Sequence, residues 1–383
     1  IMLTLYKFEL RKIISRKIVW ITGGVLLVGL VIWGIASAVL PQNREYSDSS
    51  LNGYAANRAE QEAAEQISGR AIDQKLIDEM RPAYEDFIFN GNYKEALPYL
   101  DVYNFIGRTL GTQAGAEILV CDSEAFYEKL NAQLEANTPA GLTESISFDE
   151  PIVYHGYFDG WRQIADMMKL ITCMEIMFIA ICLSTVFTVE HTRKTDQVIL
   201  CTRLGKKKLY AAKTLAGLTV GVGFTLLLSL LMFGIIAFLY GFDGYDTILQ
   251  FVLLRPFNLT VGQAALILVG LSFAGAALIS IFTMMLSEVT KNSIATIGII
   301  TGVLLVTMFI MEMPANLKLL SEIWYLLPSN LVSLNGAFRY SMFHVGGSPL
   351  AAYQYAPIVY LVLAVIFALI GKLTYNRYQI NGR

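Results

Sequence analysis

The segment EHTRKTDQVILCTRLGKKKLYAAK, residues Glu190–Lys213, separates two long apolar stretches and decides how the chain is arranged. Its basic residues are Arg193, Lys194, Arg203, Lys206, Lys207, Lys208 and Lys213. Short loops rich in lysine and arginine between membrane spans stay on the cytoplasmic side. Val198, Ile199, Leu200 and Leu204 give the same loop an apolar side, as in a short amphipathic helix. We therefore expect a short helix at the inner membrane face, accessible to a soluble protein.

The composition is that of an integral membrane protein. Of the 383 residues, 55% are hydrophobic and 16% are charged, and the mean hydropathy is +0.52. Soluble domains contain about 25% charged residues. Residues 42–165 stand apart because they hold 21 acidic and 9 basic residues, whereas basic residues gather at the two ends of the chain and in the 190–213 loop. This separation is typical of an outer acidic domain with inner basic segments.

Six apolar segments are long enough to cross about 30 Å of hydrocarbon, which takes about 20 residues. They are Ile18–Leu40, Asp166–Val189, Leu215–Tyr240, Gly262–Leu286, Ser293–Met313 and Pro357–Leu373. Ahead of them, residues 1–17 place apolar side chains at helical spacing among lysines and arginines, which predicts an amphipathic elbow helix in the cytoplasmic interface. The first apolar core exceeds the roughly 7–15 residues of a signal peptide, which favours an uncleaved anchor.

Alternation of the spans then orders the remaining segments. With a cytoplasmic N-terminus, the 190–213 loop, 287–292 and the 374–383 tail fall inside the cell. The outer segments are 41–165, 241–261 and 314–356. The sequence thus predicts an all-α, multi-pass protein of the cell membrane with both termini cytoplasmic and an extracellular domain between its first and second spans.

The outer domain, 41–165, is expected to be mainly helical. Apolar residues recur at helical spacing through Asn57–Met80, and Pro82 then ends the pattern. Ser123 is a candidate N-cap of a second helix that stops at Asn137-Thr138-Pro139. Within 314–356, the aromatic and apolar run Ile323–Pro328 is typical of a re-entrant or interfacial helix.

The motifs of catalysis are missing. The three histidines lie in different regions, and neither HExxH nor CxxC occurs. Gly205-Lys206-Lys207 lacks both the upstream glycine and the following hydroxyl residue of a P-loop. We therefore expect no enzymatic activity, no metal or cofactor in this chain and no nucleic-acid partner. Any step driven by ATP must be driven by another protein.

Glu175 is the one carboxylate placed well inside a predicted span. A charged group at the bilayer centre costs a few kcal/mol and by default suggests a functional site. Glu175 is thus a candidate for a translocation path. A carboxyl that only bonds to a neighbouring helix is the alternative, and the sequence leaves both open.

At this point the chain resembles the membrane subunit of ABC-2-type exporters, the type V exporter fold. Its elbow, six spans, outer domain and basic inner loop are similar in order. The matching motifs are Val186-Phe187-Thr188-Val189-Glu190-His191, Thr195-Asp196, Leu204-Gly205-Lys206-Lys207-Lys208, Ala212-Lys213 and the outer Leu326-Leu327-Pro328-Ser329. The large outer domain resembles the permeases of Gram-positive bacteria, whose substrates include peptides, antibiotics, lipids and ions.

The resemblance implies a permease that exports a substrate with ATP and Mg²⁺ bound by separate cytoplasmic ATPase subunits. It also implies a second permease subunit, identical or homologous, facing the first. The inner loop would contain the coupling helix, with the ATPase-docking residues Glu190, His191, Arg193, Lys194, Thr195, Asp196, Val198, Leu200, Arg203, Leu204, Gly205, Lys206 and Lys207. A membrane sensor or scaffold that transports nothing is the alternative, as is a mechanotransmission protein that moves its ligand-binding outer domain.

Overall fold

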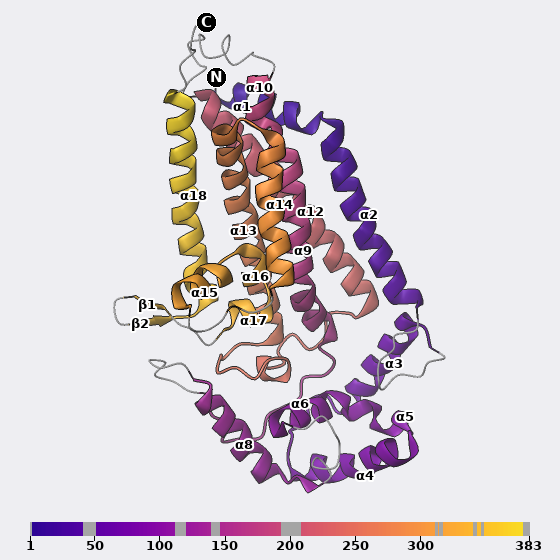
Figure 1. The fold of residues 1–383 in the computed structure, drawn as a ribbon. Helices are drawn as coiled ribbons and strands as arrows, with labels where there is room; N and C mark the ends of the chain where they lie inside the picture. Colours follow the sequence, from indigo (N-terminus) through magenta and orange to yellow (C-terminus); the bar gives the residue numbers. More distant parts are fainter. Residues whose placement is uncertain are drawn as a thin grey trace, which may run out of the picture.

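The computed structural model describes residues 2–40, 51–111, 120–138, 146–192, 208–310, 313, 317–339, 343–345 and 348–377. In these ranges the fold is a bundle of long helices with a smaller helical domain at one end (Figure 1). The helices of the bundle are α2 (Lys17–Val39), α9 (Asp159–Leu183), α10 (Thr185–Thr192), α12 (Lys208–Leu239), α13 (Val261–Thr290), α14 (Ser293–Phe309) and α18 (Ala352–Arg377). The strands β1 (Phe343–Val345) and β2 (Ser348–Leu350) form one antiparallel hairpin. The helical fold class is confirmed.

Among the described residues, five helical segments are long and apolar enough to cross a membrane. They are Lys17–Val39, Asp159–Thr192, Lys208–Leu239, Val261–Thr290 and Ala352–Asn376. The second joins α9 and α10 and begins before the predicted residue 166. The fifth predicted span, Ser293–Met313, corresponds to α14, a shorter apolar helix of 17 residues. At 1.5 Å per residue α14 is about 26 Å long, slightly less than a hydrocarbon core of about 30 Å.

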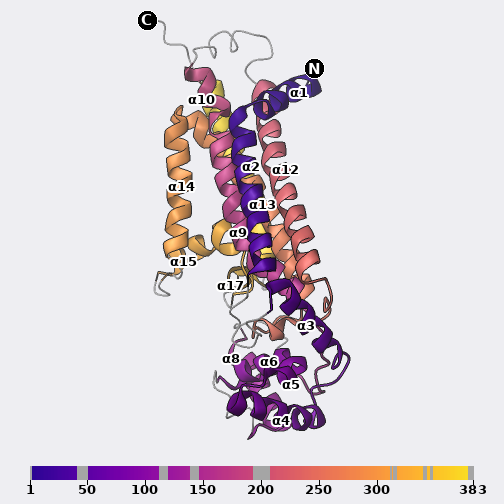
Figure 2. The same ribbon diagram turned by 90° about the vertical axis from the view of Figure 1, so that its right-hand side faces the viewer.

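Helix α13 lies at the centre of the bundle and packs against α9, α12, α14 and α18. Helices α1 and α10 and the end of α18 lie at one end of the long helices, and the smaller domain lies at the opposite end (Figure 1). The N-terminal helix α1 (Met2–Ile14) lies crosswise to the long helices and packs against α12 (Figure 2). Its buried residues are Glu9 and Ile13, so α1 presents both an acidic and an apolar side chain to the bundle.

The smaller domain is built from short helices around an aromatic and aliphatic core. These are α3 (Gly53–Glu65), α4 (Gln74–Asn90), α5 (Tyr93–Ala96), η1 (Leu97–Tyr99), α6 (Leu100–Leu110) and α8 (Ser123–Ala136). Asn52, Asp73 and Asp122 cap three of them by accepting a backbone N–H through the side chain. Asp122, rather than the predicted Ser123, therefore caps α8.

The single helix predicted over Asn57–Met80 was wrong. Helix α3 ends at Glu65, Gly69 turns the chain with a φ of 78°, and α4 begins after Asp73. Ala71 forms a bridge with Val153 in the break, so the backbone groups there are satisfied outside a helix. Pro82 lies inside α4 and does not end it, because the helix tolerates the loss of one hydrogen bond.

The smaller domain rests on the connection between α12 and α13, which includes η2 (Leu249–Phe251). The Phe105 ring stacks on Phe251 with 4.3 Å between ring centroids. The Arg108 guanidinium donates to the Val252 carbonyl at 2.7 Å and also to the Phe251 carbonyl. Asn57 donates to the Leu239 carbonyl at the end of α12. These contacts join the domain to the bundle at several points.

The segment before α18 carries α15 (Lys318–Tyr325), α16 (Pro328–Leu331) and α17 (Leu334–Ala337). These short helices lie at the end of the bundle that faces the smaller domain (Figure 1). Arg339 pairs with Glu322 and lies 5.0 Å from the Tyr325 ring centroid, which ties α15 to the residues after α17. A short helix does occupy the predicted Ile323–Pro328 region, and it ends before Pro328, the first residue of α16.

Candidate functional site

Most of the predicted docking loop lies outside the described residues. These positions are Arg193, Lys194, Thr195, Asp196, Val198, Leu200, Arg203, Leu204, Gly205, Lys206 and Lys207. The structure does describe both flanks of the loop, α10 up to Thr192 and α12 from Lys208. It also places the first two predicted docking residues, Glu190 and His191, near the end of α10.

Glu190 lies in a cluster of four charged side chains contributed by three helices. Its Oε1 atom is 2.5 Å from the Lys213 Nζ of α12 and 2.7 Å from the Lys12 Nζ of α1. Lys12 also lies 3.7 Å from Glu9 Oε2, one turn earlier in α1. We call these four residues, Glu9, Lys12, Glu190 and Lys213, the basal ion cluster. It joins the N-terminal helix to both flanks of the loop.

Three members of the basal ion cluster are buried, whereas the Lys12 side chain is 32% exposed. Lys213 is 0% exposed, Glu9 is 3% exposed and Glu190 is 5% exposed. Removing charges from water is costly, and close opposite charges and hydrogen bonds are needed to offset that cost. The charges of two carboxylates and two ammonium groups balance here. Lys213 also makes a cation–π contact with Phe187, whose ring centroid lies 5.1 Å from Nζ.

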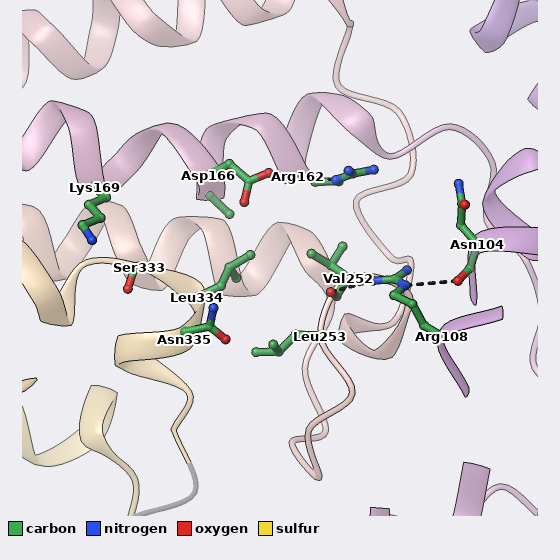
Figure 3. A pocket seen from close by; sticks show the side chains of 11 residues that line it. Asn104, Arg108, Arg162, Asp166, Lys169, Val252, Leu253, Ser333, Leu334 and Asn335 are labelled. Carbon is green, nitrogen blue, oxygen red and sulfur yellow. Dashed lines mark hydrogen bonds and ion pairs between the residues drawn. The ribbon is translucent and has the colours of Figure 1, made fainter. Parts of the chain in front are cut away.

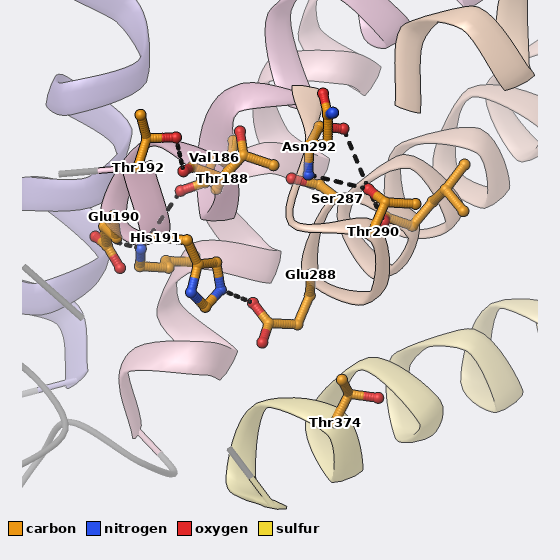
Figure 4. A network of polar contacts seen from close by, with 12 residues as sticks. Val186, Thr188, Glu190, His191, Thr192, Ser287, Glu288, Thr290, Asn292 and Thr374 are labelled. Atoms are coloured by element: carbon orange, nitrogen blue, oxygen red, sulfur yellow. Dashed lines mark hydrogen bonds and ion pairs between the residues drawn. The ribbon is translucent and has the colours of Figure 1, made fainter. Parts of the chain in front are cut away.

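The other predicted residue, His191, faces helix α13 instead of α1. Its Nε2 atom lies 3.1 Å from Glu288 Oε2, and Glu288 is fully buried. Figure 4 shows the imidazole pointing at that carboxylate. One turn along the same interface, the Ser287 hydroxyl donates to the Ser184 carbonyl at 2.6 Å. Thus α10 is fixed to α13 on one side and to α1 on the other.

An aromatic cluster completes the base of the loop. The Tyr210 ring in the first turn of α12 packs against Phe187 and Tyr375 at centroid distances of 5.5 and 5.7 Å. Its hydroxyl donates to the Ala368 carbonyl of α18 at 3.0 Å. The two ends of the loop are therefore held by α1, α13 and α18 together, and movement of the loop would be transmitted to all three helices.

Sequence reasoning did not identify three members of the basal ion cluster as partners of Glu190. From the sequence, Glu9 and Lys12 were interpreted only as part of the amphipathic pattern of residues 1–17. Lys213 was interpreted only as one of the basic residues of the loop. Two signals were present. Glu9 is acidic within an otherwise basic segment, and Lys213 stands among apolar residues at the start of a span, where a lysine needs a partner.

Glu175 lies in a separate polar region within the bundle. Its Oε2 atom accepts hydrogen bonds of 2.9 Å from Thr225 of α12 and from Ser272 of α13. The side chain is 0% exposed, so α9, α12 and α13 enclose it within one chain. The Oε1 atom has no hydrogen-bond partner among the described residues. Glu175 therefore connects three helices through one of its oxygens.

Within the described ranges, no group of three or more histidine, cysteine, aspartate or glutamate side chains could hold a metal ion. Comparison with family models identifies one family, the ABC-2 family transporter proteins, over residues 3–369. Comparisons with curated proteins and with solved structures give no match. Because the family match covers nearly the whole chain, the protein belongs to the ABC-2 transporter family and is a multi-pass membrane permease subunit of an ABC transporter that works with an ATPase subunit.

Proposed function

We propose that this permease exports its substrate, a peptide, antibiotic, lipid or ion, by using ATP hydrolysed on a separate cytoplasmic ATPase. The permease family is not itself catalytic. ATP and Mg²⁺ are therefore bound by the ATPase, and this chain supplies the path and the mechanical connection. The match to the ABC-2 family supports the subunit type.

The proposed membrane arrangement has six crossings. Helix α14 is the fifth crossing, in addition to the five longer helices, α1 is an elbow in the inner interface, both termini are cytoplasmic and residues 41–165 are extracellular. Two observations support it. Helices α1 and α10 and the end of α18 lie at the same end of the bundle, opposite the smaller domain (Figure 1). The 190–213 segment, which follows from α10, is rich in basic residues, as expected for a cytoplasmic segment.

The proposed site of energy coupling is the loop from Glu190 to Lys208, which docks on the ATPase. The observation that carries this proposal is the buried and charge-balanced basal ion cluster. A loop whose ends are fixed to several helices passes a movement of the ATPase on to those helices. A loop with flexible ends would move without displacing them. In this proposal the apolar residues Val198, Leu200 and Leu204 provide the contact with the ATPase.

A triple alanine variant of Val198, Leu200 and Leu204 tests the coupling site. We expect it to reach the membrane in normal amounts, to lose copurification with the ATPase and to lose ATP-dependent transport. Val120→Ala is the control, since Val120 is 81% exposed in the smaller domain at the opposite end of the molecule. Normal association and normal transport in the triple variant would remove the loop from the mechanism.

We further propose that two permease subunits, identical or homologous, form the transporter. Two copies with different affinity tags, expressed together with the ATPase, distinguish these cases. Recovery of both tags from one purification indicates identical subunits. Recovery of one tag together with a homologous permease identified by mass spectrometry indicates a mixed pair. A single permease per complex would contradict the proposal.

A further inference from the structure

A polar cavity of about 500 Å³ lies where the smaller domain meets the bundle. Its walls come from α6, the first turns of α9, the residues after η2 and the start of α17 (Figure 3). The residues that carry the inference are Arg108, Arg162, Asp166, Lys169 and Asn335. None of them belongs to the basal ion cluster, which lies at the other end of the long helices.

A cluster of aromatic side chains near the cavity indicates where the membrane–water interface lies, and so how deep in the membrane the cavity is. The Trp161 ring packs 5.2 Å from Phe242 and 5.1 Å from Tyr245, centroid to centroid, and its indole N–H donates to the Phe242 carbonyl. Such clusters are typical of a membrane–water interface. Lys169 lies eight residues further along α9, about 12 Å deeper at 1.5 Å per residue. The cavity therefore places a lysine below the level of the aromatic cluster.

The charges on the cavity wall do not cancel. Arg162 pairs with Asp159 at 3.2 Å and with Asp166 at 3.9 Å. Lys169 forms no ion pair and no hydrogen bond with any side chain that the structure describes, and it is only partly exposed. An ammonium group at this depth is costly unless water or an anion accompanies it.

A second cation in the cavity, the guanidinium of Arg108, also forms no ion pair with a described carboxylate. The Arg108 guanidinium donates to the carbonyls of Asn104, Phe251 and Val252, and it forms no ion pair in the described part of the chain. These bonds fix its plane. The Asp101 carboxylate attracts the guanidinium electrostatically without forming an ion pair with it. The amide of Asn335, which is exposed and lines the same cavity, can supply a neutral donor.

We propose that this cavity binds an oxyanion, a phosphate or carboxylate group carried by a molecule at the outer end of the bundle. Lys169 supplies the charge at the inner end of the cavity, and Arg108 supplies a second charge from the smaller domain. Because these two residues belong to different parts of the fold, the bound anion connects the smaller domain to α9. The volume is in the range of small-molecule sites and accommodates a phosphate-bearing headgroup.

The test uses the full permease–ATPase complex in nanodiscs made only of phosphatidylcholine, without ATP. Inorganic phosphate is titrated by calorimetry, and phosphatidylglycerol added to the nanodisc is counted by native mass spectrometry. Binding of phosphate assigns a soluble oxyanion, and binding of phosphatidylglycerol alone assigns a lipid headgroup. Failure of the wild-type complex to bind either one overturns the proposal.

Three variants make the test specific. We expect Lys169→Gln to weaken binding by roughly ten- to hundredfold, the usual loss for a hydrogen bond to a charged group. Lys169→Arg retains the charge and should retain binding. Lys75→Gln removes an exposed lysine that does not line the cavity and should bind normally. Equal binding by Lys169→Gln and the wild type would also overturn the proposal, and because no transport is measured, the result is independent of the proposed export.

Discussion

One carboxylate oxygen of Glu190 forms ion pairs with the ammonium groups of both Lys12 and Lys213. The stability of the site depends on the balance between these charges. If Glu190 is removed, the buried Lys213 loses its ion-pair partner, and if Lys213 is removed, the carboxylates of Glu190 and Glu9 share the ammonium group of Lys12. The penalty for an uncompensated buried charge exceeds the net benefit of the intact pair. Single substitutions and paired substitutions should therefore have opposite consequences.

We expect Lys213→Met to destabilise the permease by about 3–5 kcal/mol, because the two buried carboxylates of Glu9 and Glu190 would lose one of the two ammonium groups that balance them. The double variant Glu190→Gln with Lys213→Met should recover most of this loss, since no isolated charge remains. Thermal unfolding in detergent at fixed protein concentration measures both. A double variant as unstable as the sum of the two single variants would show that the residues act independently.

Glu175 permits a second test at the same scale. Glu175→Ala should cost about 2–4 kcal/mol, because the Thr225 and Ser272 hydroxyls lose their acceptor and a cavity forms among three helices. Glu175→Gln keeps an acceptor oxygen and most of the volume, so we expect near-normal stability. Transport by the glutamine variant at matched expression then separates a translocation role from a structural one. Full activity indicates that Glu175 only joins helices, and lost activity with normal folding supports a place on the path.

Asp101 should make the smaller domain sensitive to pH. Burial, together with the charge of Asp159, raises the pKa of Asp101 to about 7 from an ordinary value of 3.8, although Tyr154 donates a hydrogen bond of 2.6 Å to it. The folded state therefore holds a proton that the unfolded state has lost between these two values. Stability should fall as the pH rises through that window and then level off.

The Asp101→Asn variant checks this pH dependence. Asparagine can still accept from Tyr154 and never ionises, so the variant should gain stability over the wild type at about pH 8 and gain little at about pH 4. Unfolding temperatures of both proteins across this range measure the difference. Glu79→Gln is the contrasting control, because hydrogen bonds from Arg70 lower the pKa of Glu79 to about 2. An equal gain at both pH values would contradict the assignment.

At the scale of elements, the long helices were predictable and the contacts between them were not. Each long helix shows an apolar run that needs no partner to be recognised. The helix predictions that were wrong, in the smaller domain, have local causes. Asn57–Met80 has a continuous helical pattern, but Asp73 caps a new helix within it, and Pro82 is tolerated where a stop was predicted. The pairing of Lys12 with Glu190 spans 178 positions, and no pattern in one sequence reveals such a contact.

Helix α1 provides the test at this scale. We expect its backbone amides to be protected from hydrogen exchange, because it packs against α12 and its Lys12 bonds to Glu190. Lys12→Gln should increase exchange throughout Met2–Ile14, whereas Lys7→Gln on the exposed side of the same helix should not. Mass spectrometry of the labelled peptides gives the comparison. Equal exchange in the two variants would mean that the ion pair does not hold α1 in place.

At the scale of the whole molecule, the order of basic and acidic segments predicted which parts of the chain gather at each end. In the structure, α1, α10 and the end of α18 lie at one end of the bundle and the smaller domain lies at the other (Figure 1). Which of these ends faces the cytoplasm stays a prediction from the charge separation. The sequence could not predict how the smaller domain sits on the bundle. The contact between them depends on backbone carbonyls of the α12–α13 connection, which accept hydrogen bonds from Arg108. Every residue type has such a carbonyl, so its position cannot be predicted from the residue type.

Thiol labelling tests the proposed orientation. In a permease whose native cysteines are replaced, Val120→Cys should react with an impermeant maleimide in intact cells, because residue 120 is exposed in the smaller domain. Lys208→Cys, exposed at the opposite end, should react only after the membrane is permeabilised. The reverse pattern would invert the topology and move the docking loop outside the cell.

The position of α1 also has a consequence for how the protein is made. Lys12 is synthesised about 200 residues before Lys213, and ribosomes add roughly 5–20 residues per second. On the order of 10–40 s therefore pass before the last member of the basal ion cluster has been translated. During that interval Lys12 and Glu9 of the nascent N-terminal helix have each other but not the complete ion cluster. A cell that makes this permease must therefore keep its first helix out of wrong associations until the third long helix has been inserted.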